Sequence, residues 1–353
     1  MTATLGRRRP ESWQSASTIG IFAILTVLAI ASTPARADVA ADSARAQVAA
    51  APSAPAPAPA TPAIAPPKLG GYIQAREVGQ ERIGLTSLLN RARFSIDGPL
   101  PDRFSYRTLV ELEASAGAKS PATVSLREAT IAWNPSPFRV TAGEFKTPFT
   151  REYLIPVPAL ELADLATVVD SLAPKYDVGV MGEWALGAWA TFAGGVFNGE
   201  GANSIANRDS IAMLVGRATV RPIPQLSLGA SGTRDGADSL RWGAEAAASY
   251  LGANLRTEYV TRHVRGRAQA RDDFGWYVFE SYRVWPGMDL VARQEDFQRP
   301  TRGLSARLRG QAFGTNLYFV PNRVRLLLEF SRRRSGLKQL RSDSFIGQLQ
   351  VQF

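Results

Sequence analysis

Residues 342–353 (SDSFIGQLQVQF) restrict the fold more than any other part of the sequence, because they alternate like a strand and end on an aromatic residue. One face of this strand carries Phe345, Gly347, Leu349, Val351 and Phe353, and the other carries Ser344, Gln348, Gln350 and Gln352. Chain termini of soluble proteins usually fray into water. In a barrel that closes within lipid, the final strand pairs with the first and turns its apolar face to acyl chains. The pattern predicts an all-β, transmembrane antiparallel β-barrel.

Residues 1–37 have the features of a secretory signal peptide. Three arginines at positions 7–9 precede an apolar run at 19–31, and Ala35-Arg36-Ala37 supplies a cleavage site. Thirteen apolar residues are too few for a membrane-spanning helix. We therefore expect export, cleavage after Ala37, and a location in the outer membrane of a Gram-negative bacterium. The chain has no cysteine, so disulfides cannot stabilise it.

Residues 38–67 are predicted to be a disordered periplasmic leader, because positions 49–67 are nearly all alanine and proline. Such a tract resists helix and sheet and acts as an extended spacer. A tether to the cell envelope is the alternative interpretation. The barrel domain is expected to occupy residues 68–353.

Apolar and charged residues alternate with a period of two throughout this domain, as in a half-buried strand. Trp242, for example, alternates with Arg241 and Glu245. We predict about sixteen strands, starting near residues 69, 88, 104, 123, 138, 178, 188, 211, 226, 240, 253, 273, 288, 306, 324 and 342. Two features resist the scheme. Glu280 falls on the lipid-facing side, and the phase slips between Arg307 and Phe319, which suggests a β-bulge near residues 310–314.

Residues 148–177 interrupt the strand pattern with four prolines and a helix-like patch at 160–169. A long excursion among short connections is usually functional. In a barrel of about sixteen strands the interior is a water-filled channel. We therefore predict that this segment is a constriction loop, with Arg151, Glu152, Asp164, Asp170 and Lys175 as its selectivity candidates.

Several blocks of sequence resemble the phosphate-selective porin O and P family. They include GEFKTPFTREYL at residues 143–154, YDVGVMGEW at 176–184 and GGVFNGEGAN at 194–203. LGGYIQAREV at 69–78, RARFSIDG at 91–98 and FGTNLYFVPNRVRLLLEF at 313–330 fit the same family. The resemblance implies a trimer of sixteen-stranded barrels, with the third loop folded into each pore. It also implies a basic lumen wall.

The net charge of +10 comes mainly from arginine, whose guanidinium keeps its charge and forks onto phosphate or carboxylate. The pore-lining and anion-selectivity candidates on the polar strand faces are Arg76, Arg91, Arg93, Arg107, Arg217, Arg241, Arg256, Arg262, Arg283 and Arg293, together with Lys146. Acidic residues are interspersed with them: Asp97, Glu111, Glu113, Glu245, Glu258, Glu295 and Glu329. The alternative interpretation is that the arginines pair with these acids and brace the wall, and that Lys146 pairs with Glu144 or Glu152.

The predicted function is an outer-membrane porin that allows passive diffusion of small hydrophilic solutes and favours anions, including phosphate. A non-conducting structural or adhesive barrel tethered to the envelope is the main alternative, and a soluble exported β-protein is another. We expect no cofactor, no nucleic-acid partner and no enzymatic activity, because the single histidine, His263, has no catalytic motif around it. The expected partners are two further copies of the chain, outer-membrane lipid and lipopolysaccharide, and the barrel-assembly machinery that would read Phe353.

Overall fold

A computed structural model describes residues 65–81, 83–113, 123–204, 206–207, 210–236, 239–265, 270–301, 304–336 and 340–353. The predicted signal peptide (1–37) lies outside these residues, as does the predicted leader up to position 64. The first strand begins at Lys68.

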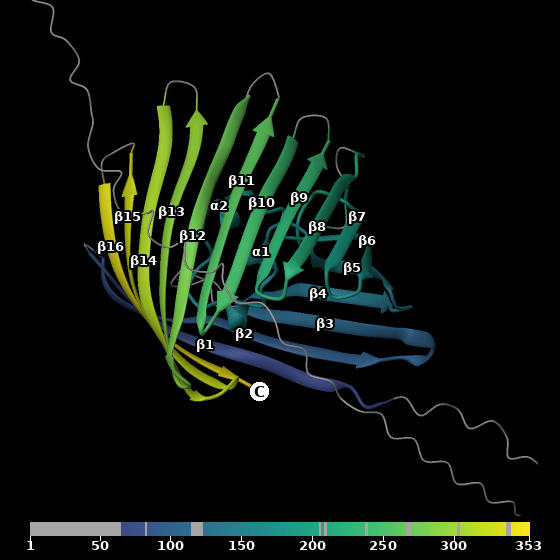
Figure 1. Cartoon of the computed structure of the whole chain (residues 1–353), viewed down its shortest axis with the longest axis horizontal. Coiled ribbons are helices and arrows are strands. Elements are labelled where there is room, and N and C mark those ends of the chain that lie inside the picture. The colour runs from purple at the N-terminus through teal and green to yellow at the C-terminus, as the bar shows by residue number, and fades with distance from the viewer. Residues whose placement is uncertain are drawn as a thin grey trace, which may run out of the picture. The chain divides into compact units, whose positions relative to one another are not determined.

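In this part of the chain, sixteen strands form one closed antiparallel barrel in which each strand pairs with its sequence neighbours (Figure 1). The predicted fold class and strand number are confirmed, and every predicted start lies within four residues of an observed one. The strands are β1 (Lys68–Gln80), β2 (Gly84–Pro99), β3 (Phe104–Glu113), β4 (Thr123–Trp133), β5 (Phe138–Lys146), β6 (Tyr176–Leu186), β7 (Ala190–Phe197), β8 (Met213–Ile223), β9 (Leu226–Asp235), β10 (Ser239–Tyr250), β11 (Ala253–Val264), β12 (Arg271–Trp285), β13 (Met288–Thr301), β14 (Leu304–Val320), β15 (Val324–Ser335) and β16 (Leu340–Gln352).

The last residue of the chain completes the closure between β1 and β16. The backbone N–H of Phe353 donates to the carbonyl of Gly71 at 3.0 Å, and the N–H of Gly71 donates to the carbonyl of Phe353 at 3.0 Å. The Phe353 ring lies 5.9 Å from the Phe94 ring. Closure satisfies the edge hydrogen bonds that an open sheet would leave unpaired in lipid.

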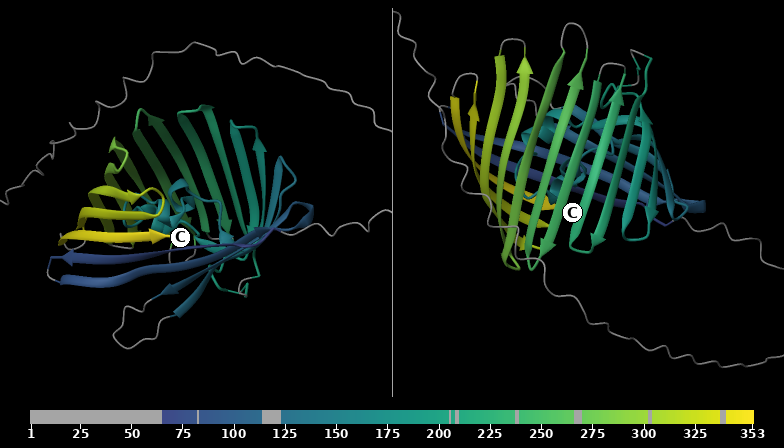
Figure 2. Two further views of the ribbon diagram at one scale, coloured as in Figure 1. Left: turned by 90° about the horizontal axis from the view of Figure 1, so that it is seen from below. Right: turned by 45° about the horizontal axis from the view of Figure 1, so that its top comes forward.

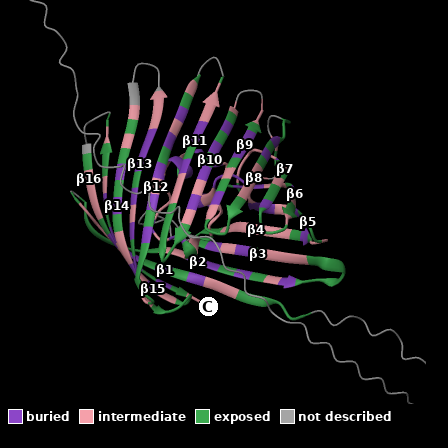
Figure 3. Ribbon diagram, in the orientation of Figure 1, coloured by how far each residue is buried: buried purple, intermediate pink, exposed green. Residues whose placement is uncertain are grey.

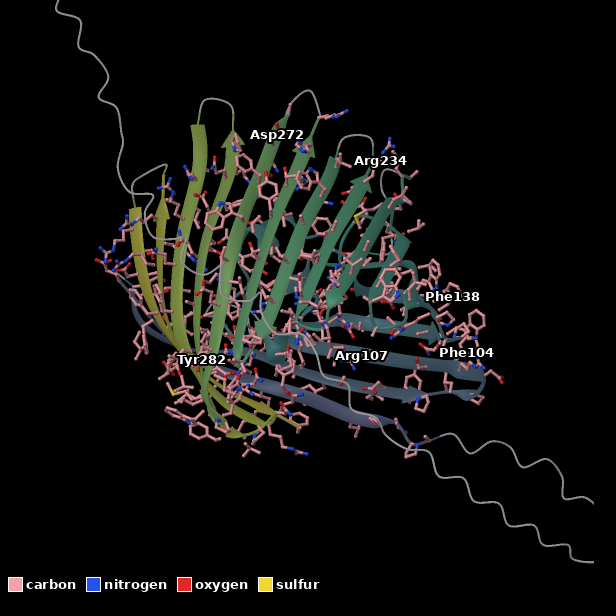
Figure 4. The ribbon with its side chains drawn as sticks, in the orientation of Figure 1. Phe104, Arg107, Phe138, Arg234, Asp272 and Tyr282 are labelled. Atoms are coloured by element: carbon pink, nitrogen blue, oxygen red, sulfur yellow. The ribbon has the colours of Figure 1, made fainter. Side chains whose placement is uncertain are left out.

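The connections differ between the two ends of the barrel. At the end that holds Gly71 and Phe353, which we call the turn end, the connections have two to four residues. At the opposite end, the loop end, four connections are longer: 114–122, 147–175, 198–212 and 265–270. Figure 4 places Tyr282, Phe104 and Phe138 toward the turn end, and Asp272 and Arg234 at the loop end. Short periplasmic turns and longer external loops are typical of outer-membrane barrels.

Buried and exposed residues alternate along the strands (Figure 3). On β10, Trp242 is exposed on the outer face while Arg241 and Glu245 are buried on the inner face. Apolar side chains on the outside and polar side chains within are the reverse of a soluble β-protein. None of the helices in the described ranges is long or apolar enough to cross a bilayer.

The connection between β5 and β6 (residues 147–175, the inserted loop) folds into the barrel, as the view from the turn end shows (Figure 2, left). It contains α1 (Arg151–Leu154), the 3₁₀ turn η2 (Val157–Ala159) and α2 (Thr167–Leu172). A second 3₁₀ turn, η1 (Pro101–Arg103), lies between β2 and β3. Phe149, Val168 and Val169 of the loop are fully buried in a cluster that includes Val260 and Tyr277 of the wall. Apolar contact thus seats the loop against β11–β13.

Three local expectations need correction. The helix predicted at 160–169 is wrong for most of its length, since α2 begins only at Thr167. The loop also ends earlier than predicted, because Tyr176 and Asp177 belong to β6. The bulge predicted near 310–314 is wrong, because the β13–β14 register is continuous there and the β14–β15 register shifts at Tyr318/Val320.

The apparent phase slip in β14 has a different origin. A side chain at Gly310 would lie within 3.0 Å of the Glu295 carboxylate, which would have to move to admit it on the lumen face. Charged residues Arg307 and Arg309 occupy the outer face near the loop end, where apolar residues were expected. Glu280 does lie on the outer face and is exposed, in register with Leu255 and Ala292.

Candidate functional site

The inserted loop is attached to the barrel wall at its start by the Glu258 carboxylate. Glu258 accepts the backbone N–H groups of Arg151 at 2.8 Å and Glu152 at 2.6 Å, and also the hydroxyl of Tyr277 at 2.7 Å. These two N–H groups belong to the first turn of α1 and have no partner within so short a helix. Glu258, on β11 of the wall, thus pairs the backbone N–H groups that the first turn of the loop leaves free.

The middle of the loop is held by wall side chains that bind its backbone. Arg325 donates to the carbonyl of Leu160 at 2.7 Å, and Arg293 donates to the carbonyl of Asp164 at 2.8 Å. The N–H of Ala163 donates to Glu329 at 2.7 Å. These contacts explain why the predicted helix does not form at 160–166, because backbone groups that a helix would pair internally are paired with the wall.

The backbone N–H groups at the start of α2 donate hydrogen bonds to carboxylate side chains. Glu295 of β13 accepts the N–H and the hydroxyl of Thr167 at 2.8 and 2.7 Å. Glu152 accepts the N–H of Ala166 at 2.8 Å and lies 3.4 Å from Arg293. Carboxylates at this position cap the helix and interact favourably with its dipole.

The acidic residues of the loop do not act as free charges in the pore. Glu161 forms a two-pronged ion pair with Arg256, and Asp164 pairs with Arg76 at 3.1 Å. Burial of Asp164 favours its neutral form, but Arg76 outweighs burial and lowers the pKa of this carboxyl below its ordinary value. The acidity of the loop sequence is therefore largely compensated by arginines of the wall.

An open cavity of about 780 Å³ remains between the loop and the wall. Its charged lining has six basic and three acidic residues, which leaves a positive excess. The basic residues are Arg91, Arg93, Arg127, Lys146, Lys175 and Arg333, and the acidic ones are Glu111, Asp164 and Asp170. Tyr153 and Tyr176 also line it. We call this cavity the constriction.

Three arginines of the constriction converge on one carboxylate. Glu111 on β3 lies 3.5 Å from Arg91, 2.9 Å from Arg93 and 2.6 Å from Arg127. Glu111 is thus shared by three guanidinium groups. Among the described residues that line the constriction, basic side chains outnumber acidic ones by six to three, which leaves positive charge at the open space.

Lys146 lies at the end of β5, on the edge of the constriction. Its ammonium group donates to the carbonyls of Tyr153 and Ile155 and lies 4.9 Å from the Tyr153 ring. No ion pair among the described residues joins it to Glu144 or Glu152, the partners considered in the sequence analysis. Its contacts leave its charge uncompensated. Lys175, by contrast, pairs with Asp170 at 2.8 Å.

The other arginine candidates lie on inner strand faces but away from the constriction. Arg217 pairs with Glu245, Arg241 lies 3.5 Å from Asp235, and Arg262 donates to Ser239 at 3.3 Å. Near the turn end, Arg107 pairs with Asp97 and Glu128, and Arg283 pairs with Asp289. For Arg107, Arg217, Arg241 and Arg283 the structure shows the pairing with acids that the alternative interpretation described. Arg151 donates to Ser227 at the foot of the loop.

Sequence reasoning missed three basic residues. Arg325 and Arg333 share the inner face of β15 with Glu329, so the alternation that placed Glu329 could have found them. Arg127 gave no such signal. A register shift opposite Leu109 and Val110 makes it the extra residue of a bulge, and strict alternation would have placed it opposite in phase to inward-facing Glu128.

Comparison with known proteins agrees with this architecture. The model of the family phosphate-selective porin O and P matches residues 76–235, which include the inserted loop and most of the constriction wall. The predicted family resemblance is confirmed. No curated protein sequence matches the chain.

Solved porin structures share the fold at low sequence identity. The trimer form of OmpT, an outer membrane protein of Vibrio cholerae, has a TM-score of 0.61 at 11% identity, covering 82% of this chain and 99% of that one. An anion-selective porin from Comamonas acidovorans has a TM-score of 0.59 at 12% identity, with coverage of 82% and 99%. Salmonella typhi OmpF, in a complex with daunomycin, has a TM-score of 0.62 at 10% identity, with coverage of 81% and 97%.

Proposed function

We propose that this porin-fold chain is an outer-membrane channel for the passive diffusion of small hydrophilic solutes, with a preference for anions. Solutes would pass through the constriction, between the inserted loop and the wall of β2–β4. The observation that carries the proposal is the positive excess in the described lining of the constriction, where six basic side chains face three acidic ones.

Selectivity would follow from pore electrostatics. Rings and rows of arginine and lysine favour anions in a narrow pore. The permeating ion passes these charges at a distance shorter than the screening length of the salt solution, so their attraction is largely retained. Arginine also forks onto the oxygens of phosphate or carboxylate. Inorganic phosphate and small organic anions are thus the solute classes that this wall suits. The proposal assigns no catalytic role to any residue.

The assembly and location of the channel are part of the same proposal. The exposed apolar belt and closed backbone support insertion in the outer membrane, and the sequence of residues 1–37 supports export by a cleaved signal peptide. A homotrimer is supported by the family resemblance and by the trimer form of the structurally similar OmpT. Phe353, whose backbone closes the barrel, would be the residue that the assembly machinery reads.

Single-channel recording in a planar bilayer, with a salt gradient to measure the reversal potential, tests the proposal. The wild type should open in steps and reverse at a potential that shows anion preference. R91Q/R127Q should reduce that preference, because it removes two charges from the constriction while Arg93 still pairs with Glu111. R221Q/R323Q is the matched control, since both arginines are exposed at the turn end.

Each outcome separates the candidate functions. Steps with equal permeability to both ions would leave a general porin and reject the anion preference. The absence of steps from folded, heat-modifiable protein would reject transport and favour the non-conducting structural barrel. An equal loss of selectivity in R221Q/R323Q would show that overall charge, rather than the constriction, sets the preference.

A further inference from the structure

We propose that the outer face of β13–β16 near the loop end binds the phosphate groups of a phosphorylated glycolipid in the outer leaflet. This surface, which we call the outer arginine patch, lies on the opposite side of the wall from the lumen. It contains Arg307, Arg309, Arg332, Arg334 and Arg341, with Asp296 and Asp343. The inference does not depend on the solute that the pore passes.

Strand register arranges this patch in rows. One row crosses the four strands from β13 to β16 and consists of Asp296, Arg309, Arg334 and Arg341, each in register with the next. The next outward-facing row toward the turn end consists of Gln294, Gln311, Arg332 and Asp343. Neighbouring strands lie about 4.8 Å apart, and successive residues on one face are separated by about 6.8 Å. The charged and amide groups therefore form a continuous polar surface.

Positive charge exceeds negative charge within the patch. Asp296 forms ion pairs with both Arg307 and Arg309. Asp343 forms ion pairs with both Arg332 and Arg341. Arg334 is exposed and has no ion pair among the described residues. Five arginines against the two aspartates and Glu81, which adjoins Asp343 and acts on Arg341, leave a net charge of +2. Pairing within the wall therefore does not account for the whole cluster.

An apolar row lies directly beside the polar rows. It consists of Ala292, Phe313, Phe330 and Phe345, which follow one another across the same four strands. Phe313 and Phe345 are 55% and 53% exposed. The guanidinium carbon of Arg332 lies 5.6 Å from the centre of the Phe330 ring. Cationic and apolar rows in this order match an amphiphile that has phosphates above acyl chains.

The chemistry favours a lipid phosphate over other occupants. Arginine binds phosphate through two parallel hydrogen bonds, and a surface beside acyl chains is partly shielded from water and salt. Basic residues near an anionic membrane surface each contribute about 1 kcal/mol, or roughly a fivefold change in binding. A free anion in solution would gain nothing from the phenylalanine row.

Binding of lipid A with two phosphates to the folded protein in detergent micelles tests this proposal, with native mass spectrometry as the readout. The wild type should retain this lipid more strongly than the same lipid after its phosphates are removed. R309Q/R334Q should weaken retention by roughly 25-fold. R221Q/R323Q, which removes the same charge at the turn end, should bind as the wild type does.

Three results would overturn the proposal. Equal retention of the phosphorylated and dephosphorylated lipids would mean that only acyl chains are bound. Equal weakening in R221Q/R323Q would mean that net charge, not this patch, attracts the lipid. Displacement of the lipid by inorganic phosphate at millimolar concentration would identify a site for free phosphate. Unchanged single-channel conductance of R309Q/R334Q would confirm that the variant folds and that its pore is intact.

Discussion

The guanidinium of Arg256 on β11 holds Glu161 of the inserted loop through two hydrogen bonds of 2.8 Å each. The side chains are 13% and 19% exposed, and the guanidinium lies 4.0 Å from the centre of the Phe279 ring. A two-pronged pair fixes orientation as well as distance. It therefore ties the far side of the loop to a strand distant in sequence.

Breaking this pair is expected to loosen the loop. E161Q leaves Arg256 with a charge that is largely buried and without its carboxylate, at a cost of up to about 3 kcal/mol. Single-channel recordings should show increased open-channel noise, and unfolding should begin at a lower temperature. R256Q/E161Q should be less perturbed than the sum of the two single variants. Simple additivity of the two effects would show that the pair is not coupled.

The anchor at Glu258 should matter more than its neighbour Tyr277. E258Q offers one acceptor oxygen where the carboxylate accepts three donors, so the first turn of α1 loses at least one partner. Y277F removes a single hydrogen bond, worth about 1 kcal/mol. Proteolysis within residues 151–165 should therefore be faster in E258Q than in Y277F. Equal rates in the two variants would contradict the anchoring role.

Access to the constriction can be measured by thiol labelling, because the chain has no cysteine of its own. Asp170 lines the constriction and is exposed to it. D170C should react with a negatively charged methanethiosulfonate, and its conductance should then decrease stepwise. R323C, at the turn end, should be labelled with no change in conductance. If D170C is labelled and its conductance does not change, the solute path does not pass this residue.

Barrel closure should depend on the absence of a side chain at Gly71. An added Cβ would lie 2.4 Å from the carbonyl oxygen of Arg93 and 2.9 Å from the Phe353 ring. G71A is therefore expected to displace the β1–β2 or β1–β16 pairing, at a cost of about 1–3 kcal/mol. The heat-modifiability transition in gels should shift to lower temperature. G182A is the control, because a Cβ there meets open space.

The attachment of Asp164 predicts a response to acid. Because Arg76 lowers the pKa of this carboxyl below its ordinary value of 3.8, the carboxylate stabilises the folded loop at pH values above that range. The stabilisation should be lost only as the pH falls through the lowered pKa. The contribution of Asp164 should therefore be the same at pH 7 and at pH 5. D164N should show more noise than the wild type at both pH values, and loss of this difference at pH 5 would argue against this assignment.

The strand pattern was predictable because it depends on local chemistry. In β10, alternation of Trp242 with Arg241 and Glu245 is imposed by the two faces of a strand, one in lipid and one in water. The same rule placed all ten predicted arginines on inner faces. It failed at Arg127, because a bulge adds one residue and reverses the phase beyond it.

The sequence by itself therefore determined the barrel, the number of strands and the position of the loop. The strands follow from the alternation of apolar and polar residues, and the loop follows from the place where that alternation is interrupted. Only the tertiary structure decided what each charge does. Arg76, Arg256 and Arg293 hold the loop, whereas Arg91 and Arg93 face open space with Arg127. Nothing in a period of two distinguishes these sets. The difference arises from where the inserted loop lies across the barrel, and contacts between residues about a hundred positions apart fix that location.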